Sequence, residues 1–151
     1  MILDSVLQFS DYQDLSGCTS SAVTLATNVI DLGAVDTGKD AFGNDEPWNL
    51  GSITWFVNLS ESLTGACLTY AELVTGSGTS TGAVTSNVTI ARFEFAATAA
   101  VGTKRSMIVQ YEGIGRYLGV EYSTSTASLT TGHVDSGLIL GYNDSSKAVK
   151  F

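Results

Sequence analysis

The sequence has few basic residues, a single proline and no long apolar run. Its 151 residues include seven Lys and Arg against fifteen Asp and Glu, for a formal net charge of −8. A protein that binds nucleic acid neutralises phosphates with a basic surface, so we expect no nucleic-acid partner. No stretch approaches the roughly 20 apolar residues of a membrane-spanning helix, and we therefore expect no membrane partner.

Cysteine is also scarce. Two residues, Cys18 and Cys67, are too few for the disulfide framework of a small secreted scaffold. The N-terminus lacks a basic segment, and Asp4 falls where a signal peptide would be apolar. We therefore expect synthesis in the cytoplasm, with both thiols reduced.

A single histidine, His133, limits the catalytic chemistry that the sequence can support. In a strand, Asp135 would share a face with His133, as an orienting carboxylate does with a catalytic base, but no nucleophile is identifiable beside them. Two Cys and one His without close spacing do not form a zinc site. We favour a surface strand at this position and expect no enzyme, no metal site and no cofactor.

Acidic residues cluster in one Gly-rich segment. Asp36, Asp40, Asp45 and Glu46 could offer oxygen ligands to Ca²⁺, but their spacing matches no helix-loop-helix calcium loop, and we favour a solvated loop. Residues 1–75 carry a net charge of −9 (ten acids, one base), and residues 76–151 carry +1 (five acids, six bases). This asymmetry serves either solubility alone or docking on a basic surface.

Small and hydroxylated residues replace the missing charge. Ser, Thr and Gly make up about a third of the chain, while hydrophobic residues make up 44%, which argues against disorder and fits one domain with one core. Apolar and polar residues mostly alternate, and Ile53, Trp55 and Val57 share one face. This pattern predicts strands near residues 22–27, 28–32, 52–59, 66–75, 88–95, 105–111, 117–123 and 134–142.

Clusters of Gly, Ser, Asn and Asp separate these strands, and their spacing predicts an antiparallel sandwich or barrel. The alternation slips within 88–95, which indicates either a β-bulge near Ala91 and Arg92 or a strand buried on both faces. Trp55 is interpreted as a core residue, and 76–82 as a flexible tip. No segment has a convincing helical pattern.

Several short motifs occur in an order that resembles a known family. They are Met1-Ile-Leu-Asp4, Ser10-Asp11 with Gln13, the run 27–33, Glu46-Pro47, Arg116-Tyr-Leu-Gly-Val-Glu-Tyr122, Leu129-Thr-Thr-Gly132 and Leu138-Ile-Leu140. Together they resemble the tailed-phage capsid cement protein family of the type described in a Bordetella phage. The tail over 143–151 extends beyond the point where members of that family tend to stop.

This resemblance implies an all-β, single-domain antiparallel jelly-roll sandwich of about eight strands. It also implies a structural role on the virion exterior, after synthesis in the host cytoplasm. There the protein would bind the major capsid protein, hold neighbouring capsomers together and self-associate as a dimer or trimer at capsomer junctions. One alternative is a jelly-roll carbohydrate-binding or tail-associated adhesion module, which an exposed aromatic platform would favour.

We expect an N-terminal arm over residues 1–20, ahead of a jelly-roll domain over residues 21–151. Exposed apolar arms usually dock on a partner, and the candidate capsid interface is Ile2, Leu3, Val6, Leu7 and Phe9. The other interpretation is that this arm folds back over its own sheet. The second candidate contact is the acidic segment with Asp36, Asp40, Asp45 and Glu46.

Overall fold

The structure, a computed structural model, describes residues 7–31, 52–65, 67–109 and 114–141. These residues form eleven strands and no α-helix, and the strands pair only in antiparallel fashion. In the same residues no helix has the length and apolar character needed to cross a membrane. The predicted all-β antiparallel sandwich is confirmed.

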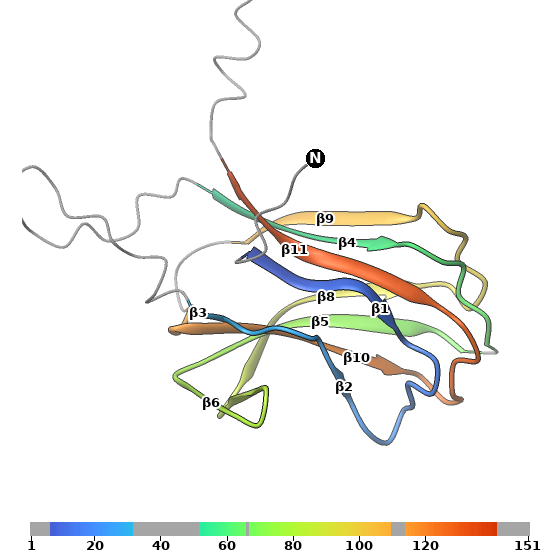
Figure 1. Cartoon of the computed structure of the whole chain (residues 1–151), viewed down its shortest axis with the longest axis horizontal. Helices are drawn as coiled ribbons and strands as arrows, with labels where there is room; N and C mark the ends of the chain where they lie inside the picture. The colour runs from blue at the N-terminus through green and yellow to red at the C-terminus, as the bar shows by residue number, and fades with distance from the viewer. Residues whose placement is uncertain (1–6, 32–51, 66, 110–113, 142–151) are drawn as a thin grey trace, which may run out of the picture.

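Two sheets stack as two layers, and a short hairpin lies beside them (Figure 1). The first sheet contains, in spatial order, β1 (Gln8–Asp14), β11 (His133–Gly141), β4 (Ser52–Leu59) and β9 (Lys104–Val109). The second contains β2 (Thr24–Leu25), β10 (Tyr117–Thr124), β5 (Thr69–Gly76) and β8 (Val88–Phe95), and β3 (Ile30–Asp31) also pairs with β10. The hairpin consists of β6 (Gly78–Ser80) and β7 (Ala83–Thr85).

The core lies between the two sheets, because each strand turns alternate side chains inward. Trp55 of β4 is fully buried, as predicted, and stacks on Phe93 of β8 with ring centroids 4.3 Å apart. Its indole N–H donates a hydrogen bond to Ser136 Oγ over 3.2 Å. Tyr122 of β10 is also buried, and its hydroxyl lies 2.9 Å from Ser10 Oγ on β1. The polar ends of both aromatic side chains therefore have partners, as burial requires.

Strand β8 carries a bulge, where its register against β5 shifts. The partners of Leu73 and Val74 are Ala91 and Thr89, so Ile90 is an extra residue. The predicted β-bulge is therefore confirmed, one residue before the expected position. Because an extra residue reverses the alternation, both phenylalanines of β8 face the core.

The hairpin of β6 and β7 packs on the outer face of the second sheet. Its turn residues Thr81 and Gly82 have φ angles of 52° and 77°, the left-handed conformations of a two-residue type I′ turn. Val84 of the hairpin is buried over Gly119 of β10, where an added Cβ would lie 2.9 Å from Val84 Cγ2. The interpretation of 76–82 as a flexible tip is therefore wrong, since much of this segment belongs to a packed strand pair.

The first strand begins within the expected arm. β1 pairs with β11 at one edge of the first sheet, and its residue Phe9 is fully buried in the core. The expected division into an arm over 1–20 and a domain over 21–151 is therefore corrected, because the sandwich already includes β1.

Candidate functional site

The structure describes two of the residues that the sequence analysis proposed as contacts. Phe9 is fully buried, and Leu7 packs against the core as a partly buried residue. The expectation that Phe9 contacts the capsid is corrected, because its own sandwich already covers its apolar surface. The other candidates lie outside the described residues: Ile2, Leu3, Val6, Asp36, Asp40, Asp45 and Glu46.

Polar side chains gather where β1 and β11 meet the segment that follows β4. The imidazole Nδ1 of His133 lies 2.5 Å from Glu61 Oε2, and the Tyr12 ring stacks on the imidazole with centroids 4.2 Å apart. The φ angle of Tyr12 is 45°, a left-handed conformation that is strained for a residue with a side chain. Neighbouring groups must therefore hold Tyr12 in place.

Asp135 holds the Tyr12 backbone in this conformation. Its carboxylate accepts hydrogen bonds from the backbone N–H of Tyr12 and from Ser60 Oγ, each over 2.7 Å. Ser60 therefore donates to Asp135 and not to His133, whereas a hydrolase needs a hydrogen bond between its nucleophile and its base. The contacts of these residues join β1, β11 and the segment after β4 at one edge of the sandwich. Their role is therefore to hold these segments in position.

Asp14 ends β1 beside this cluster. The backbone N–H and the hydroxyl of Ser16 donate hydrogen bonds to its carboxylate over 2.7 and 2.8 Å. These bonds lower the pKa of Asp14, and the nearby His133 lowers it further to a smaller extent. Asp14 is thus a stabilised carboxylate at the end of an edge strand.

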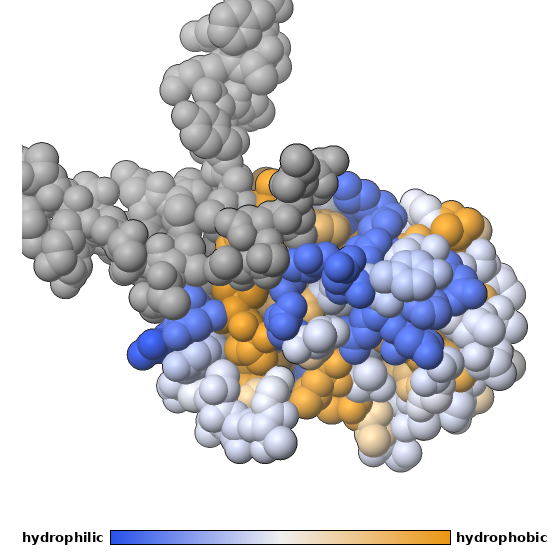
Figure 2. Space-filling model, viewed as in Figure 1, coloured by the Kyte–Doolittle hydropathy of each residue, from blue (hydrophilic) through white to orange (hydrophobic). Residues whose placement is uncertain are grey.

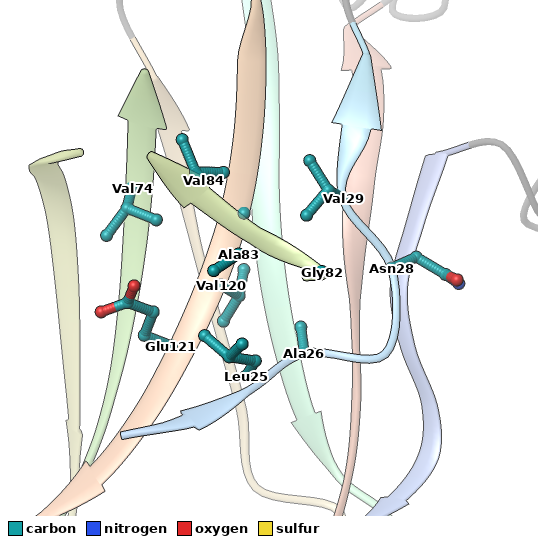
Figure 3. Close-up of a pocket in the computed structure, with 11 residues that line it drawn as sticks. Leu25, Ala26, Asn28, Val29, Val74, Gly82, Ala83, Val84, Val120 and Glu121 are labelled. Carbon is teal, nitrogen blue, oxygen red and sulfur yellow. The ribbon is translucent and has the colours of Figure 1, made fainter. Parts of the chain in front are cut away.

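A shallow hollow lies on the outer face of the second sheet, between the β6–β7 hairpin and the segment that carries β2 and β3 (Figure 3). Its lining includes Val29, Val74, Val84 and Glu121, and its volume is about 10 Å³. The Glu121 carboxylate accepts a 2.7 Å hydrogen bond from Asn87, and burial raises the pKa of Glu121. This volume is about the room of one water molecule, far below the roughly 300–1,000 Å³ of a small-molecule pocket, so the hollow is too small for a ligand.

Apolar and polar surfaces are separated on the face shown in Figure 2. Apolar surface follows β2 and β3, and hydrophilic surface covers much of β1. Among the described residues, the large apolar side chains that are exposed are Tyr12, Val23, Val88, Val101, Met107 and Ile108. Two of these, Met107 and Ile108, are neighbours on the edge strand β9.

A comparison with protein families gives a match. Residues 9–138 match the model of a protein family described as Bbp16. The match runs from the second residue of β1 into β11, so it includes residues from every strand of both sheets. No curated protein matches the chain.

Proposed function

Since the chain belongs to the Bbp16 family, whose name indicates a Bordetella phage protein, we propose that it is a capsid decoration protein. In this proposal the protein lies on the outside of an icosahedral head, binds the major capsid protein and stabilises contacts between capsomers. Dimers or trimers at capsomer junctions would add many modest contacts through multivalency. The family match supports a phage protein across the whole scaffold, because it spans both sheets. The order of motifs that resembles capsid cement proteins supports decoration in particular.

The strand order supports the jelly roll that this role implies. Counting β2 and β3 as one interrupted strand, and setting the β6–β7 hairpin aside, leaves eight strands. Numbered along the chain, these run 1-8-3-6 in the first sheet and 2-7-4-5 in the second. Strand 1 therefore neighbours 8, 2 neighbours 7, 3 neighbours 6 and 4 neighbours 5, as when one long hairpin is rolled into two sheets. Jelly rolls of this kind occur in viral capsid proteins and in lectins.

Polar contacts between distant segments suit a protein that must transmit force between capsomers. The Arg116 guanidinium donates two hydrogen bonds to the Asp31 carboxylate, over 2.8 and 2.9 Å, at the pairing of β10 with β3. At another edge, His133 contacts Glu61 and the Tyr12 ring. These contacts hold edge strands on the sandwich and favour a rigid clamp.

A carbohydrate-binding or adhesion module is the alternative, and it requires an open aromatic platform. On the second sheet, the Arg92 guanidinium lies over the Tyr70 ring, 3.7 Å from its centroid. The Arg116 guanidinium lies 5.2 Å from the centroid of the Tyr117 ring. Cations cover both of these rings, and the exposed Tyr12 ring has one face stacked on His133. These rings therefore do not form an open platform on which a sugar would stack, and we retain capsid decoration as the proposal.

The test uses heads of the phage that encodes this chain, prepared without this protein. Purified protein is added, and bound protein is measured after the heads are sedimented. We expect saturable decoration and a higher temperature of DNA release from the decorated heads. Folded protein that does not bind heads would reject the proposal, and its retention on immobilised glycans would favour the adhesion module.

A further inference from the structure

The free edge of β9 differs from the rest of the described surface in its charge. Of the four described cations, Arg92 lies 3.4 Å from Glu72, and Arg116 is paired with Asp31. Lys104 and Arg105 have no carboxylate within ion-pair distance among the described residues. Two uncompensated positive charges are thus adjacent on one strand of a protein with a net charge of −8.

Two apolar residues, Met107 and Ile108, follow these two cations after Ser106. Met107 is 38% exposed and Ile108 is 64% exposed, although both lie within a paired strand. Adjacent strand residues point to opposite faces, so the strand exposes apolar surface on both sides. The edge therefore offers a basic half followed by an apolar half.

Within the described residues, no strand pairs with β9 on the side away from β4, and one carbonyl on β9, that of Lys104, accepts a long 3.4 Å hydrogen bond from the Arg105 side chain. In the part of the chain that is described, β9 pairs with β4 alone and ends the first sheet (Figure 1). The Leu59 N–H donates to Thr103, and the Ser60 N–H donates to His133 on the opposite side. Backbone groups alternate in direction along a strand, so Lys104, Ser106 and Ile108 direct theirs away from β4.

An edge with free backbone groups is a template for an additional strand. We propose that the free edge of β9 binds an extended segment of a partner protein that carries carboxylates opposite Lys104 and Arg105 and apolar side chains opposite Met107 and Ile108. This inference rests on the proposed function, in which that segment belongs to the major capsid protein.

Charge decides between this partner and a second copy of the chain. Antiparallel pairing of two β9 strands would bring four uncompensated cations into one ladder. An acidic and apolar segment instead compensates the charge of Lys104 and Arg105 and covers Ile108. We therefore assign the edge to a partner with acidic residues.

The first test uses a synthetic peptide as the probe. Acetyl-Thr-Val-Val-Thr-Glu-Glu-Thr-amide, aligned antiparallel, places Glu opposite both cations and Val opposite Met107 and Ile108. Nuclear magnetic resonance of the ¹⁵N-labelled full chain should show saturable shifts of the Ser106 and Ile108 amides. Reversing both charges (K104E with R105E) should weaken binding by about tenfold. A peptide with Lys in place of Glu should bind that variant better than it binds the original chain.

A matched pair of variants tests the backbone contact. Ser106→Pro removes an N–H that points away from β4, so the sheet should survive while peptide binding is lost. Ser106→Ala removes only the hydroxyl and should bind normally. Equal binding by both variants, shifts confined to other strands, or no shifts at millimolar peptide would overturn the inference. Concentration-dependent shifts at β9 without peptide would assign the edge to a second copy instead.

The same pair on heads separates this inference from the proposed function. Loss of decoration by Ser106→Pro, but not by Ser106→Ala, supports both the proposed function and the assignment of β9 to the capsid. If the original chain does not bind heads but binds the peptide at β9, decoration is rejected and the binding site at the β9 edge stands. If both variants decorate heads equally, decoration stands and the assignment of β9 to the capsid is rejected.

Discussion

Gly76 of β5 lies so close to Thr85 of the hairpin that a Cβ added to Gly76 would be 2.4 Å from the Thr85 carbonyl oxygen. The same atom would lie 2.6 Å from Val84 Cγ1. Glycine at position 76 therefore allows β7 to approach the second sheet, and this approach forms one wall of the hollow in Figure 3.

We expect Gly76→Ala to lower the free energy of unfolding by about 2 kcal/mol, because a backbone carbonyl must move to admit the methyl group. Gly82→Ala is the control, since an added Cβ meets open space there but the φ angle is 77°. For that variant we expect the free energy of unfolding to fall by only about 1 kcal/mol, the cost of placing a residue with a side chain in the left-handed conformation. Urea denaturation measures both, and a Gly76→Ala protein of unchanged stability would contradict the close approach.

Phe9 should contribute to folding and not directly to binding. Removing a fully buried aromatic side chain typically costs about 3–5 kcal/mol, so Phe9→Ala should be strongly destabilised in a thermal melt. Deleting residues 1–6 leaves β1 intact and should preserve the melting temperature. If that truncated protein also decorates heads as tightly as the full chain, Ile2, Leu3 and Val6 are not contacts.

The cluster around His133 should affect stability slightly and decoration not at all. His133→Ala removes the stacking on Tyr12 and the contact with Glu61, and both lie at a partly exposed site. We expect a loss of about 1 kcal/mol in urea denaturation. Head sedimentation provides the second measurement, and a folded His133→Ala protein that fails to bind heads would give the cluster a functional role.

Tyr122 should make stability depend on pH in the alkaline range. Burial raises the pKa of Tyr122 to about 12 from its ordinary 10.0, although a hydrogen bond with Ser10 opposes the shift. The raised pKa means that its contribution is complete below pH 10 and is lost as pH rises toward 12. The loss should reach about 2–3 kcal/mol. Denaturation across this range measures it, and Tyr122→Phe, which cannot ionise, should lack this step.

The local pattern of the sequence determined most of the strands and part of the core. Alternation of apolar and polar residues is a property of each segment alone, so it predicted β4, β5, β8, β10 and β11. It also placed Trp55 inside, because this residue shares a face with other apolar residues. The slip within 88–95 indicated the bulge for the same reason.

Only the tertiary structure made residues 8–14 a strand. Phe9 and Ser10 are adjacent and both fully buried, and the register against β11 shifts twice between Gln8 and Gln13. These irregularities remove the alternation by which a strand is recognised. Pairing with β11 supplies the order that the local pattern does not, which is why this segment was interpreted as an arm.

The polar contacts and the exposed edge were also decided by the fold. Glu61 and His133 are 72 residues apart, and no local spacing connects them until β11 pairs with β4. The segment of β9 resembles the other predicted strands in composition, yet its place at the end of the first sheet exposes Met107 and Ile108. The local sequence determined which segments are extended, whereas their order in the sheets, set by packing across the core, decided which backbone groups remain free for a partner.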